Sequence, residues 1–470
     1  METLTKRILA IVIIAVIGTG IGLGAYFFLL APGAGEYVWT AADAPGAPSN
    51  ITASQIIKIG CAGDLGEIQG DGNWEGAYLA AKKINQAGGL DVGGTTYYFG
   101  VTAEDTDESN PNLVTSRGVA AARRLIYNKK VDYAMGGFRS EALLAYQEEF
   151  MDAQMIFIDT GAATDIFCEN VNNSYSRYKY FFRFMPINST SLGGQIIATL
   201  VGFILTMNAT YPNHEVKQIG ILAEDLTWVS GIVAAIQAYI PLYTNLTTGG
   251  TWEAEVLTPI LYDITLSATD MNTHLATFQS QGADIVIPVI SAQGGILMMQ
   301  QYALNTYDYL IFGIDVQSQL DTFWADSSGA CAYETIMQTL HETNKTANSL
   351  QFWNDFKTEW GHEPLYTAVG AYDAVMGLKD AINATQSFAE NDIIAEFESW
   401  TPSNPHPGVG GGGAWNPQTH DLIAGYPFGY TLWCQWQPGG VKKVVPASIY
   451  PAWLATGSYL VAPWVNATWY

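Results

Sequence analysis

The hydrophobic pattern changes character along this chain. Residues 8–30 form one long apolar run without a charged residue. From residue 55 onward, short apolar runs alternate with segments in which apolar residues recur at helical spacing. This alternation predicts strand, helix, strand, helix through most of the chain. Such an order is typical of parallel sheets that are covered by helices on both faces.

The apolar run at 8–30 is long enough to cross a membrane. As a helix it would span about 35 Å at a rise of ~1.5 Å per residue. The nearby cations, Lys6 and Arg7, precede it, so we expect the short N-terminus inside the cell and the rest outside. Residues 1–31 are therefore predicted to be an N-terminal transmembrane anchor in the cell membrane, with a cleaved secretory signal as the alternative. Residues 32–54, rich in small residues and proline, predict a flexible linker.

The alternation then divides into two successive α/β units and a tail. In the first unit, strands are expected at 56–60, 97–103, 131–135 and 155–158, and helices at 74–86, 113–127 and 141–151. In the second, strands are expected at 217–222, 284–290 and 309–314, and helices at 195–207, 228–239 and 296–304. Helices at 349–360 and 366–384 follow without strands between them, and the aromatic strand 430–436 comes last. This tail of different character suggests that the chain crosses between two lobes more than once.

The charge and cysteine content of the chain argue against nucleic acid and metal ions as partners. The chain has 20 Lys and Arg against 44 Asp and Glu, a net charge of −24, and such a surface repels nucleic acid. The cysteine spacings fit neither a zinc site nor a redox motif, and we predict a disulfide between Cys331 and Cys434, which flank segments expected to be neighbours. Asn-x-Ser/Thr sequons predict a glycosylated outer surface. They begin at Asn50, Asn172, Asn188, Asn208, Asn245, Asn344, Asn383 and Asn466.

Catalytic and cofactor motifs do not stand out. The chain contains no Gly-x-Ser-x-Gly elbow, no His-Glu-x-x-His pair and no phosphate loop ending in Gly-Lys-Ser/Thr. Gly408–Gly413 matches G-x-G-x-x-G, but it follows a proline-rich loop rather than a strand. The histidines show no metal-ligand spacing. We therefore expect a protein that is not an enzyme and that needs neither a cofactor nor a metal.

Segments at the ends of the predicted strands and helices carry a family resemblance. They are Ile57–Gly60, Gly76–Gly89 (GAYLAAKKINQAGG), Glu104–Asp107, Met135–Ser140, Asp159–Thr164 and Phe181–Pro186 (FFRFMP). In this order they resemble the type I periplasmic solute-binding proteins of the leucine/isoleucine/valine-binding family. Those proteins are receptors of ABC importers for branched-chain amino acids, with relatives for amides and urea. The resemblance covers nearly all of residues 55–450.

The resemblance implies a two-lobed α/β fold, the type I periplasmic-binding fold. It has two doubly wound parallel sheets joined by a three-strand hinge, here placed after the N-terminal transmembrane helix. The first lobe would comprise residues 55–186 and 341–426. The second lobe would comprise residues 187–340 and 427–470, the latter including the C-terminal tail. A small solute would bind in the cleft between the lobes, beyond the carboxyl ends of the strands.

The family pattern assigns ligand contacts residue by residue. In the first lobe, Ser140 would bind an amino-acid carboxylate, with Arg139 adding a charge-assisted bond; alternatively, Ser140 caps the following helix. In the turn after the fourth strand, the family uses the residues at Ala162, Ala163 and Thr164 for the ammonium and the carboxylate, although an ordinary polar turn is the alternative.

The second lobe and the side-chain pocket depart further from the pattern. Trp228 stands where the family has an aromatic residue, usually tyrosine, and it could equally be a buried residue at a helix start. Ser291 lies where a second tyrosine is frequent, which puts amino-acid specificity in doubt. Asp315 matches the acidic residue that pairs with ammonium, with a capping role as the alternative. Residues 65–70 and Trp74 would line the side-chain pocket, although core packing explains Trp74 equally well.

The function implied is that of a membrane-tethered extracytoplasmic solute-binding protein. It would capture an amino acid, of branched-chain type or a similar small polar solute, and deliver it to the permease subunits of an ABC importer. Alternatives are a ligand-sensing ectodomain that acts with a separate signalling partner and a binding protein for urea or short-chain amides. A hydrolase of a small amide or sugar is a further alternative, which the missing nucleophile motif argues against.

Overall fold

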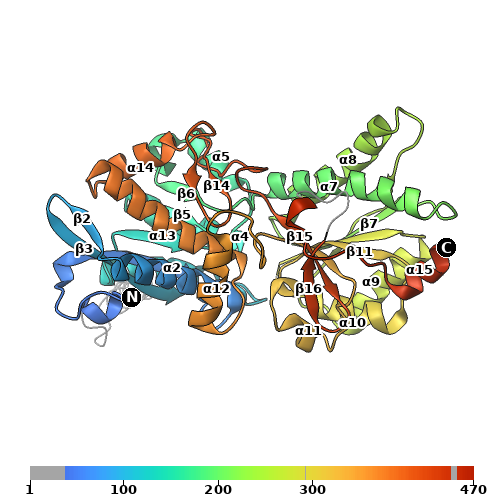
Figure 1. Cartoon of the computed structure of the whole chain (residues 1–470), viewed down its shortest axis with the longest axis horizontal. Helices are drawn as coiled ribbons and strands as arrows, with labels where there is room; N and C mark the ends of the chain where they lie inside the picture. Colours follow the sequence, from blue (N-terminus) through green and yellow to red (C-terminus); the bar gives the residue numbers. More distant parts are fainter. Residues whose placement is uncertain (1–36, 292, 446–451) are drawn as a thin grey trace, which may run out of the picture. The chain divides into compact units, whose positions relative to one another are not determined.

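The computed structural model describes residues 37–291, 293–445 and 452–470. The predicted anchor at 1–31 and the first part of the predicted linker lie outside these residues. Residues Thr40–Tyr470 form one compact unit, and this unit contains two large β-sheets, each with its own helices. The two sheets define two lobes, which lie at opposite ends of the view in Figure 1.

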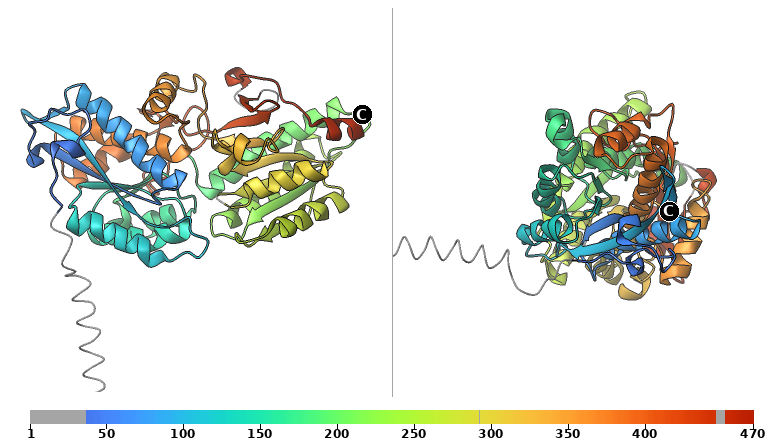
Figure 2. Two further views of the ribbon diagram at one scale, coloured as in Figure 1. Left: turned by 90° about the horizontal axis from the view of Figure 1, so that it is seen from below. Right: turned by 90° about the vertical axis from the view of Figure 1, so that its left-hand side faces the viewer.

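The first lobe is built on a sheet in the order β2-β3-β1-β4-β5-β6. Its strands are β1 (Ile56–Gly63), β2 (Leu90–Val92), β3 (Thr95–Asp105), β4 (Tyr133–Gly136), β5 (Phe157–Asp159) and β6 (Phe181–Arg183). Its helices are α2 (Ile68–Gln86), α3 (Thr115–Arg123), α4 (Ser140–Asp152), α5 (Ile166–Asn173), α6 (Tyr175–Tyr178), α12 (Ser349–Trp360), α13 (Tyr366–Thr385) and α14 (Glu390–Ser399). The left view of Figure 2 shows α2 and the teal helix α4 on opposite sides of this sheet.

The second lobe is built on a sheet in the order β16-β15-β12-β11-β10-β7-β8, with β9 also paired to β7. Its strands are β7 (Gln218–Glu224), β8 (Glu255–Val256), β9 (Ile260–Tyr262), β10 (Ile285–Ile290), β11 (Leu310–Asp315), β12 (Thr335–Gln338), β15 (Leu432–Gln437) and β16 (Val441–Val444). Its helices are α7 (Ser189–Thr210), α8 (Val229–Thr247), α9 (Ala268–Ser280), α10 (Gly295–Asn305), α11 (Phe323–Asp326) and α15 (Pro463–Trp469). By length and composition, α7 and α8 are apolar enough to span a membrane, but half of the apolar window in α7 is buried, as in a core helix.

Both sheets are mixed, whereas the sequence analysis expected two parallel sheets. In the first lobe, β2 runs antiparallel to β3, and in the second, β15 runs antiparallel to both β12 and β16. The pairs β2–β3 and β15–β16 are hairpins whose turns contain Gly93-Gly94 and Gly439-Gly440, and all four glycines have positive φ; β15 itself reaches β12 from a segment far along the chain. Glycine adopts that backbone region without steric cost, so these turns allow the chain to reverse directly instead of crossing over through a helix.

The chain passes between the two sheets three times. These passages are residues 184–188 between β6 and α7, residues 339–348 between β12 and α12, and the segment before β15, which includes the short β13 (His406–Pro407) and β14 (Gly412–Gly413). Lys345 joins the last two passages. Its buried Nζ donates to the carbonyl oxygens of Thr339 at 2.6 Å, Gly410 at 2.5 Å and Tyr430. Burial lowers the pKa of Lys345 to about 7, while the charge of Asp373 acts in the opposite direction.

The predicted disulfide is not formed. All four cysteines are free and buried. Cys331 packs in a core cluster of the second lobe with Phe323 and Trp436, whereas Cys434 belongs to a separate cluster with Ile336 and Leu432. Although their segments are neighbours, the side chains of Cys331 and Cys434 lie in different parts of the core. Burial raises the pKa of each of these two thiols to about 12, which keeps them protonated and unreactive.

Candidate ligand-binding site

A cavity lies between the two lobes, with an empty volume of about 610 Å³ that includes space open to solvent. Most of its wall residues lie at or just after the carboxyl ends of strands: β4 and β5 in the first lobe, and β7, β10, β11 and β12 in the second. Others lie at the starts of α7 and α13. Ligands of open α/β sheets bind at the carboxyl ends of strands, so this cavity is the candidate site. It is lined by Phe138, Arg139, Gly161, Ala163, Ile187, Leu192, Leu226, Trp228, Ser291, Ile314, Val316, Gln319, Met337, Thr339, Tyr366 and Thr431.

The turn after β5 forms part of the wall on the first lobe. Asp159, the last residue of β5, accepts hydrogen bonds from the backbone N–H groups of Gly161 at 3.0 Å and Ala162 at 2.8 Å. The side chain thereby folds the backbone back on itself, as an aspartate in a turn commonly does. Tyr366, at the start of α13, donates its hydroxyl to the carbonyl oxygen of Gly161 at 3.0 Å. The turn is thus fixed from two sides before any ligand binds.

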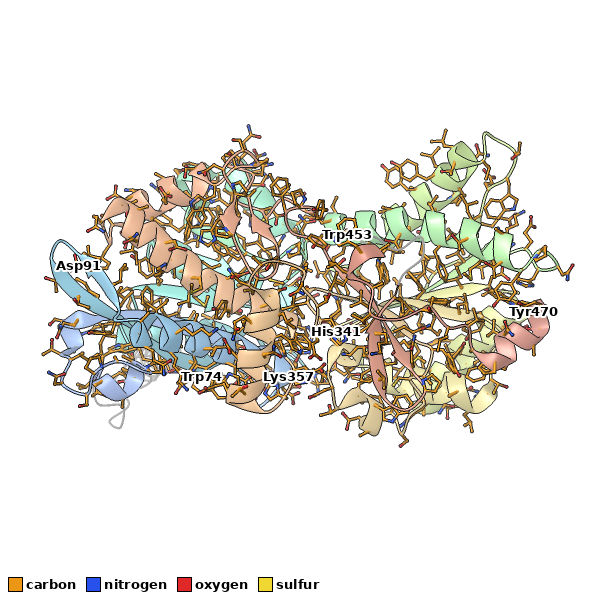
Figure 3. The ribbon with its side chains drawn as sticks, in the orientation of Figure 1. Trp74, Asp91, His341, Lys357, Trp453 and Tyr470 are labelled. Carbon is orange, nitrogen blue, oxygen red and sulfur yellow. The ribbon has the colours of Figure 1, made fainter. Side chains whose placement is uncertain are left out.

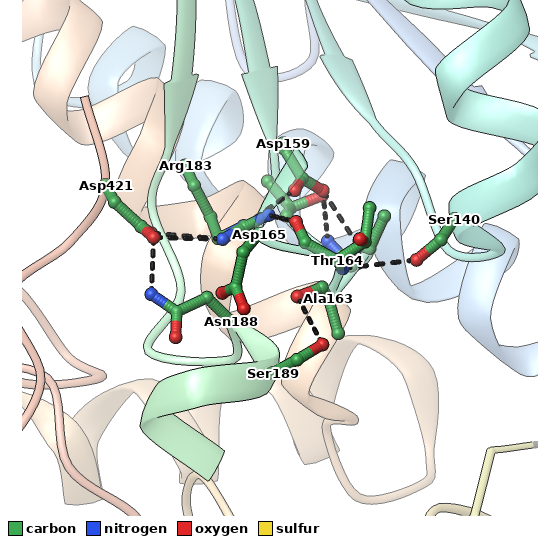
Figure 4. Close-up of polar contacts among 12 residues, drawn as sticks. Ser140, Asp159, Ala163, Thr164, Asp165, Arg183, Asn188, Ser189 and Asp421 are labelled. Atoms are coloured by element: carbon green, nitrogen blue, oxygen red, sulfur yellow. Dashed lines mark hydrogen bonds and ion pairs between the residues drawn. The ribbon is translucent and has the colours of Figure 1, made fainter. Parts of the chain in front are cut away.

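Arg183 anchors the same turn through Asp159 and Thr164 (Figure 4). Its guanidinium contacts Asp159 at 3.0 Å and Asp421 at 3.1 Å, and it donates to the carbonyl oxygen of Thr164 at 2.5 Å. The side chains of Arg183 and Asp159 are fully buried. Every nitrogen of this buried guanidinium has a hydrogen-bond partner, so this network sets the position of the turn rather than binding solute.

Three of the predicted first-lobe contacts belong to this support. Ser140, the first residue of α4, accepts a hydrogen bond on Oγ from the backbone N–H of Thr164 at 3.2 Å. Ser140, Ala162 and Thr164 are buried and do not line the cavity. The N-cap residue of α4 is Arg139 rather than Ser140. Ala163 does line the cavity, as predicted. Direct ligand contact by all four residues stays a prediction.

Arg139 lines the cavity next to Ala163. Its Nη1 donates to the carbonyl oxygen of Asn110 at 3.0 Å, and its Nε lies 3.5 Å from Glu141, too far for a strong hydrogen bond. Burial raises the pKa of Glu141, but the hydrogen bond from Thr227 and the charge of Arg139 outweigh it and hold that pKa below its ordinary value. Glu141 is therefore ionised, and the guanidinium keeps donor capacity for a further acceptor.

Two predicted residues line the cavity from the second lobe. Trp228 is buried just before α8, and its Nε1 has no hydrogen-bond partner in the described part of the chain. Ser291 follows β10 and donates its hydroxyl to Glu224 at 2.7 Å. Trp228 thus offers an apolar face and an indole N–H to the cavity. The hydroxyl of Ser291 is already used, so this residue contributes shape more than a free donor.

Asp315, predicted to pair with an ammonium group, is not among the residues that line the cavity. Ile314 and Val316 line the cavity, whereas Asp315 between them does not. Because side chains alternate along a strand, Asp315 faces the other side of the sheet. There a Cβ added to Gly295, the first residue of α10, would lie 2.1 Å from Asp315 Oδ2, so the carboxyl group occupies the space left by this glycine. Burial raises the pKa of Asp315 to about 7 and raises that of the neighbouring Glu334 further, so the pair holds a proton at neutral pH.

Trp74 and residues 65–70 also lie elsewhere. The ring of Trp74 packs at 5.2 Å from both Tyr78 and Trp360, which joins α2 to the end of α12. Figure 3 labels Trp74 on the first lobe. Among the described side chains of residues 65–67, 69 and 70, none lines the candidate site; Glu67 lines a second, acidic cavity together with Asp64. Trp74 is thus partly buried in an aromatic cluster between α2 and α12, and its contact with a ligand stays a prediction.

Direct contacts join the lobes on either side of the cavity. Glu141 of α4 accepts a hydrogen bond from the backbone N–H of Thr227, in the second lobe, at 2.7 Å. Gln293, also in the second lobe, donates its side-chain amide to the carbonyl oxygen of Ser109, in the first lobe, at 3.1 Å. Both contacts require the lobes to be close, so the structure represents an arrangement in which the cavity is bounded from both sides.

Much of the lining was not predicted from the sequence. Met337 and Thr339 come from β12 and the passage after it, Tyr366 from the start of α13, and Thr431 from the passage before β15. None of these residues stands in a recognisable motif. The available signal was the repeated crossing between lobes, because crossing segments must run past a site between the lobes. Among the described residues, no group of three or more His, Cys, Asp or Glu side chains could hold a metal ion.

The chain belongs to the periplasmic binding protein family, whose sequence profile matches residues 57–430. This confirms the resemblance found in the sequence. Among curated proteins, no relative was found. The structural neighbours below are branched-chain amino acid and other solute-binding proteins of ABC transporters, and at 17–18% identity their likeness shows the two-lobed fold.

Three solved structures illustrate this likeness. LivJ of Streptococcus pneumoniae, a branched-chain amino acid transporter substrate-binding protein in complex with isoleucine, is 17% identical with a TM-score of 0.63, covering 82% of this chain and 97% of that one. A branched-chain amino acid ABC transporter protein from Silicibacter pomeroyi is 17% identical with a TM-score of 0.67, covering 87% and 99%. An ABC transporter solute-binding protein from Rhodopseudomonas palustris in complex with 3,4-dihydroxybenzoic acid is 18% identical with a TM-score of 0.63, covering 87% and 99%.

Proposed function

We propose that this chain is the extracytoplasmic solute-binding protein of an ABC importer. It captures a small organic solute in the cavity between its lobes and presents it to the permease subunits. The observation that carries the proposal is the cavity itself, because both lobes line it and it sits beyond the strand ends of both sheets. The contacts of Glu141 and Gln293 across the lobes support a mechanism in which lobe closure encloses the solute.

The relatives suggest two classes of ligand. An amino acid of branched-chain type, expected from the sequence, agrees with the isoleucine bound to LivJ. An aromatic acid agrees with the dihydroxybenzoic acid bound to the Rhodopseudomonas protein. Urea and short-chain amides are the further class that the sequence resemblance suggests. All of these are small organic solutes, and the cavity that would receive them is partly open to solvent.

The surface location completes the proposal. Residues 1–31 anchor the protein in the cell membrane, and the lobes stand outside the cell. Glycosylation is proposed at the sequons, of which Asn50, Asn172, Asn344 and Asn383 are exposed. Two sequons differ, because the side-chain nitrogen of Asn188 donates to Asp421 in the network beneath the site and that of Asn208 donates to the carbonyl oxygen of Val216 at 3.3 Å. A glycan on either nitrogen would replace one of its two hydrogens and crowd that contact, so we expect Asn188 and Asn208 to stay unmodified.

Calorimetric titration tests this function. The full chain, purified in mild detergent, is titrated with branched-chain, polar and acidic amino acids, with benzoate and 3,4-dihydroxybenzoate, and with urea and short amides. We expect saturable binding of at least one class, with the affinity reduced about 10-fold or more in Trp228→Ala, which removes a buried aromatic wall. Trp252→Ala is the matched control, since Trp252 lies outside the cavity and binds Glu215. Equal loss in both variants, or no binding by any class, would refute the proposal.

A further inference from the structure

We infer that the cavity selects a small monocarboxylate with an apolar body and without an ammonium group. This inference rests on the proposed function and specifies the ligand class of the same site. Four observations support it: the charge on the wall, the missing counter-charge for an ammonium, the apolar remainder of the lining, and an unpaired indole N–H on the second lobe.

Arg139 supplies the charge. Among the described residues that line the cavity, it is the one charged side chain. A guanidinium has five N–H donors. Nη1 uses one of them on Asn110, and Nε has no hydrogen-bond partner within the described chain. The side chain is only 12% exposed, so water screens its charge poorly. A carboxylate is the ligand group that accepts two parallel N–H bonds from such a fork.

A matching negative charge for an ammonium group is missing from the described lining. Asp315, the residue expected to provide it, faces α10 on the other side of the sheet and shares a proton with Glu334. The carbonyl oxygen of Gly161 already accepts from Tyr366. Gln319 offers one unpaired amide oxygen to the cavity. The hydroxyl oxygens of the lining are neutral acceptors too, but without a carboxylate they would leave the charge of an ammonium uncompensated.

The remaining lining favours an apolar body. Hydrocarbon side chains come from both lobes and from the passages between them: Phe138, Ile187, Leu192, Leu226, Ile314, Val316 and Met337. Apolar surface buried against such walls contributes about 25 cal/mol per Å². The Nε1 of Trp228, buried without a hydrogen-bond partner in the described chain, adds a donor on the lobe opposite Arg139. The carboxylate of a bound acid can accept hydrogen bonds from donors on both lobes. Closure of the lobes over an acid would therefore give partners to the N–H groups of Arg139 and Trp228 that otherwise have none in the described chain.

Matched ligands isolate the amino group in the test. Leucine is compared with 4-methylpentanoate, which has the same skeleton without the amino group, and with 4-methylpentanamide, which lacks the negative charge. Phenylalanine is compared with 3-phenylpropanoate in the same way. The full chain in detergent is titrated by calorimetry at pH 7.5. The expected result is that each free acid binds at least about 10-fold more tightly than its amino acid and its amide, because hydrogen bonds to charged groups are the stronger ones.

Variants assign the result to residues. Arg139→Gln should weaken binding of the acid about 10- to 100-fold, as expected for losing a hydrogen-bonded charge, and Arg139→Lys should restore part of the loss. Asp315→Asn should leave the affinity for the acid within about 3-fold, since Asp315 faces away from the cavity. Thermal unfolding of each variant shows whether it is folded, and the Lys variant keeps the charge if the Gln variant is unstable.

The outcomes separate the inference from the proposed function. Tighter binding of leucine than of 4-methylpentanoate, with the affinity lost in Asp315→Asn, would overturn the inference and keep the function. Binding of the acid that is unchanged in folded Arg139→Gln would also overturn it. No detectable binding of any acid, amino acid or amide would overturn both the inference and the proposed function.

Discussion

Removing Arg183 tests whether the network beneath the cavity sets the position of the turn. In Arg183→Met, the apolar stem keeps roughly the same volume, but Asp159 and Asp421 lose their shared cation. Asp159 is fully buried and Asp421 is nearly so. Breaking a buried ion pair by removing one partner costs about 3–5 kcal/mol. The entropy of unfolding is ~2.1 cal/mol/K per residue, or roughly 0.9 kcal/mol per degree for about 430 residues. Dividing the free-energy cost by this entropy gives an expected fall in Tm of about 3–6 °C.

The matched control is an arginine that pairs with two carboxylates at the surface. Arg177 contacts Glu148 and Asp152, and its side chain is 40% exposed. Arg177→Met should cost less than about 1 kcal/mol, which corresponds to a fall in Tm of about 1 °C. Differential scanning calorimetry measures both variants, and titration with a bound ligand then shows whether Arg183→Met weakens binding as the turn loses its anchor. Equal small shifts in the two variants would refute the reasoning, because burial would then confer no additional stability on the network.

Three further predictions follow from single features. Gly161→Ala should lower both the Tm and ligand affinity, because its Cβ would lie 1.9 Å from the carbonyl oxygen of Gly137; Gly194→Ala, in open space on α7, should leave both unchanged or raise the Tm. Lys345 has a pKa of about 7 when folded against 10.5 when unfolded, so the unfolded chain binds the extra proton between these values. The stability of the native chain relative to Lys345→Met should therefore rise from pH 7 to pH 9 in urea titrations, and a fall would contradict the assignment. Under denaturing, non-reducing conditions all four cysteines should be alkylated, and dithiothreitol should leave the Tm unchanged.

The sequence predicted the parts of the fold that depend on local pattern. The strand at 285–290 and the helix at 349–360 stand where the apolar spacing placed them. Helix α9 (Ala268–Ser280) was missed, since polar residues dominate it and its buried positions are few. Strand β12 was missed because it is four residues long and gains its stability from neighbours far along the chain. Short strands of that kind carry too little periodicity to be recognised alone.

The same contrast holds within the site. Arg139, Ala163, Trp228 and Ser291 line the cavity because each follows a strand end, and strand ends can be located from sequence. Asp315 lies outside the cavity lining. Side chains alternate between the two faces of a strand, so a shift of one residue relative to the family pattern places a side chain on the opposite face. The lining residues from the passages between lobes depend on contacts between distant segments, for which a single sequence carries no local signal.

The carboxylate of Glu141 stands between two partners that move differently. Thr227 belongs to the opposite lobe and holds Oε1 at 2.7 Å, whereas Arg139 belongs to its own lobe and lies 3.5 Å from Oε2. If the lobes separated, the Thr227 N–H would leave, and Arg139, which already pairs with this carboxylate, would be its remaining partner. Glu141 then competes with any anion for the guanidinium. On opening, the Glu141 carboxylate would in this way replace the carboxylate of a bound acid at the Arg139 guanidinium. The dissociation rate of the acid would then be coupled to the opening motion through a single side chain.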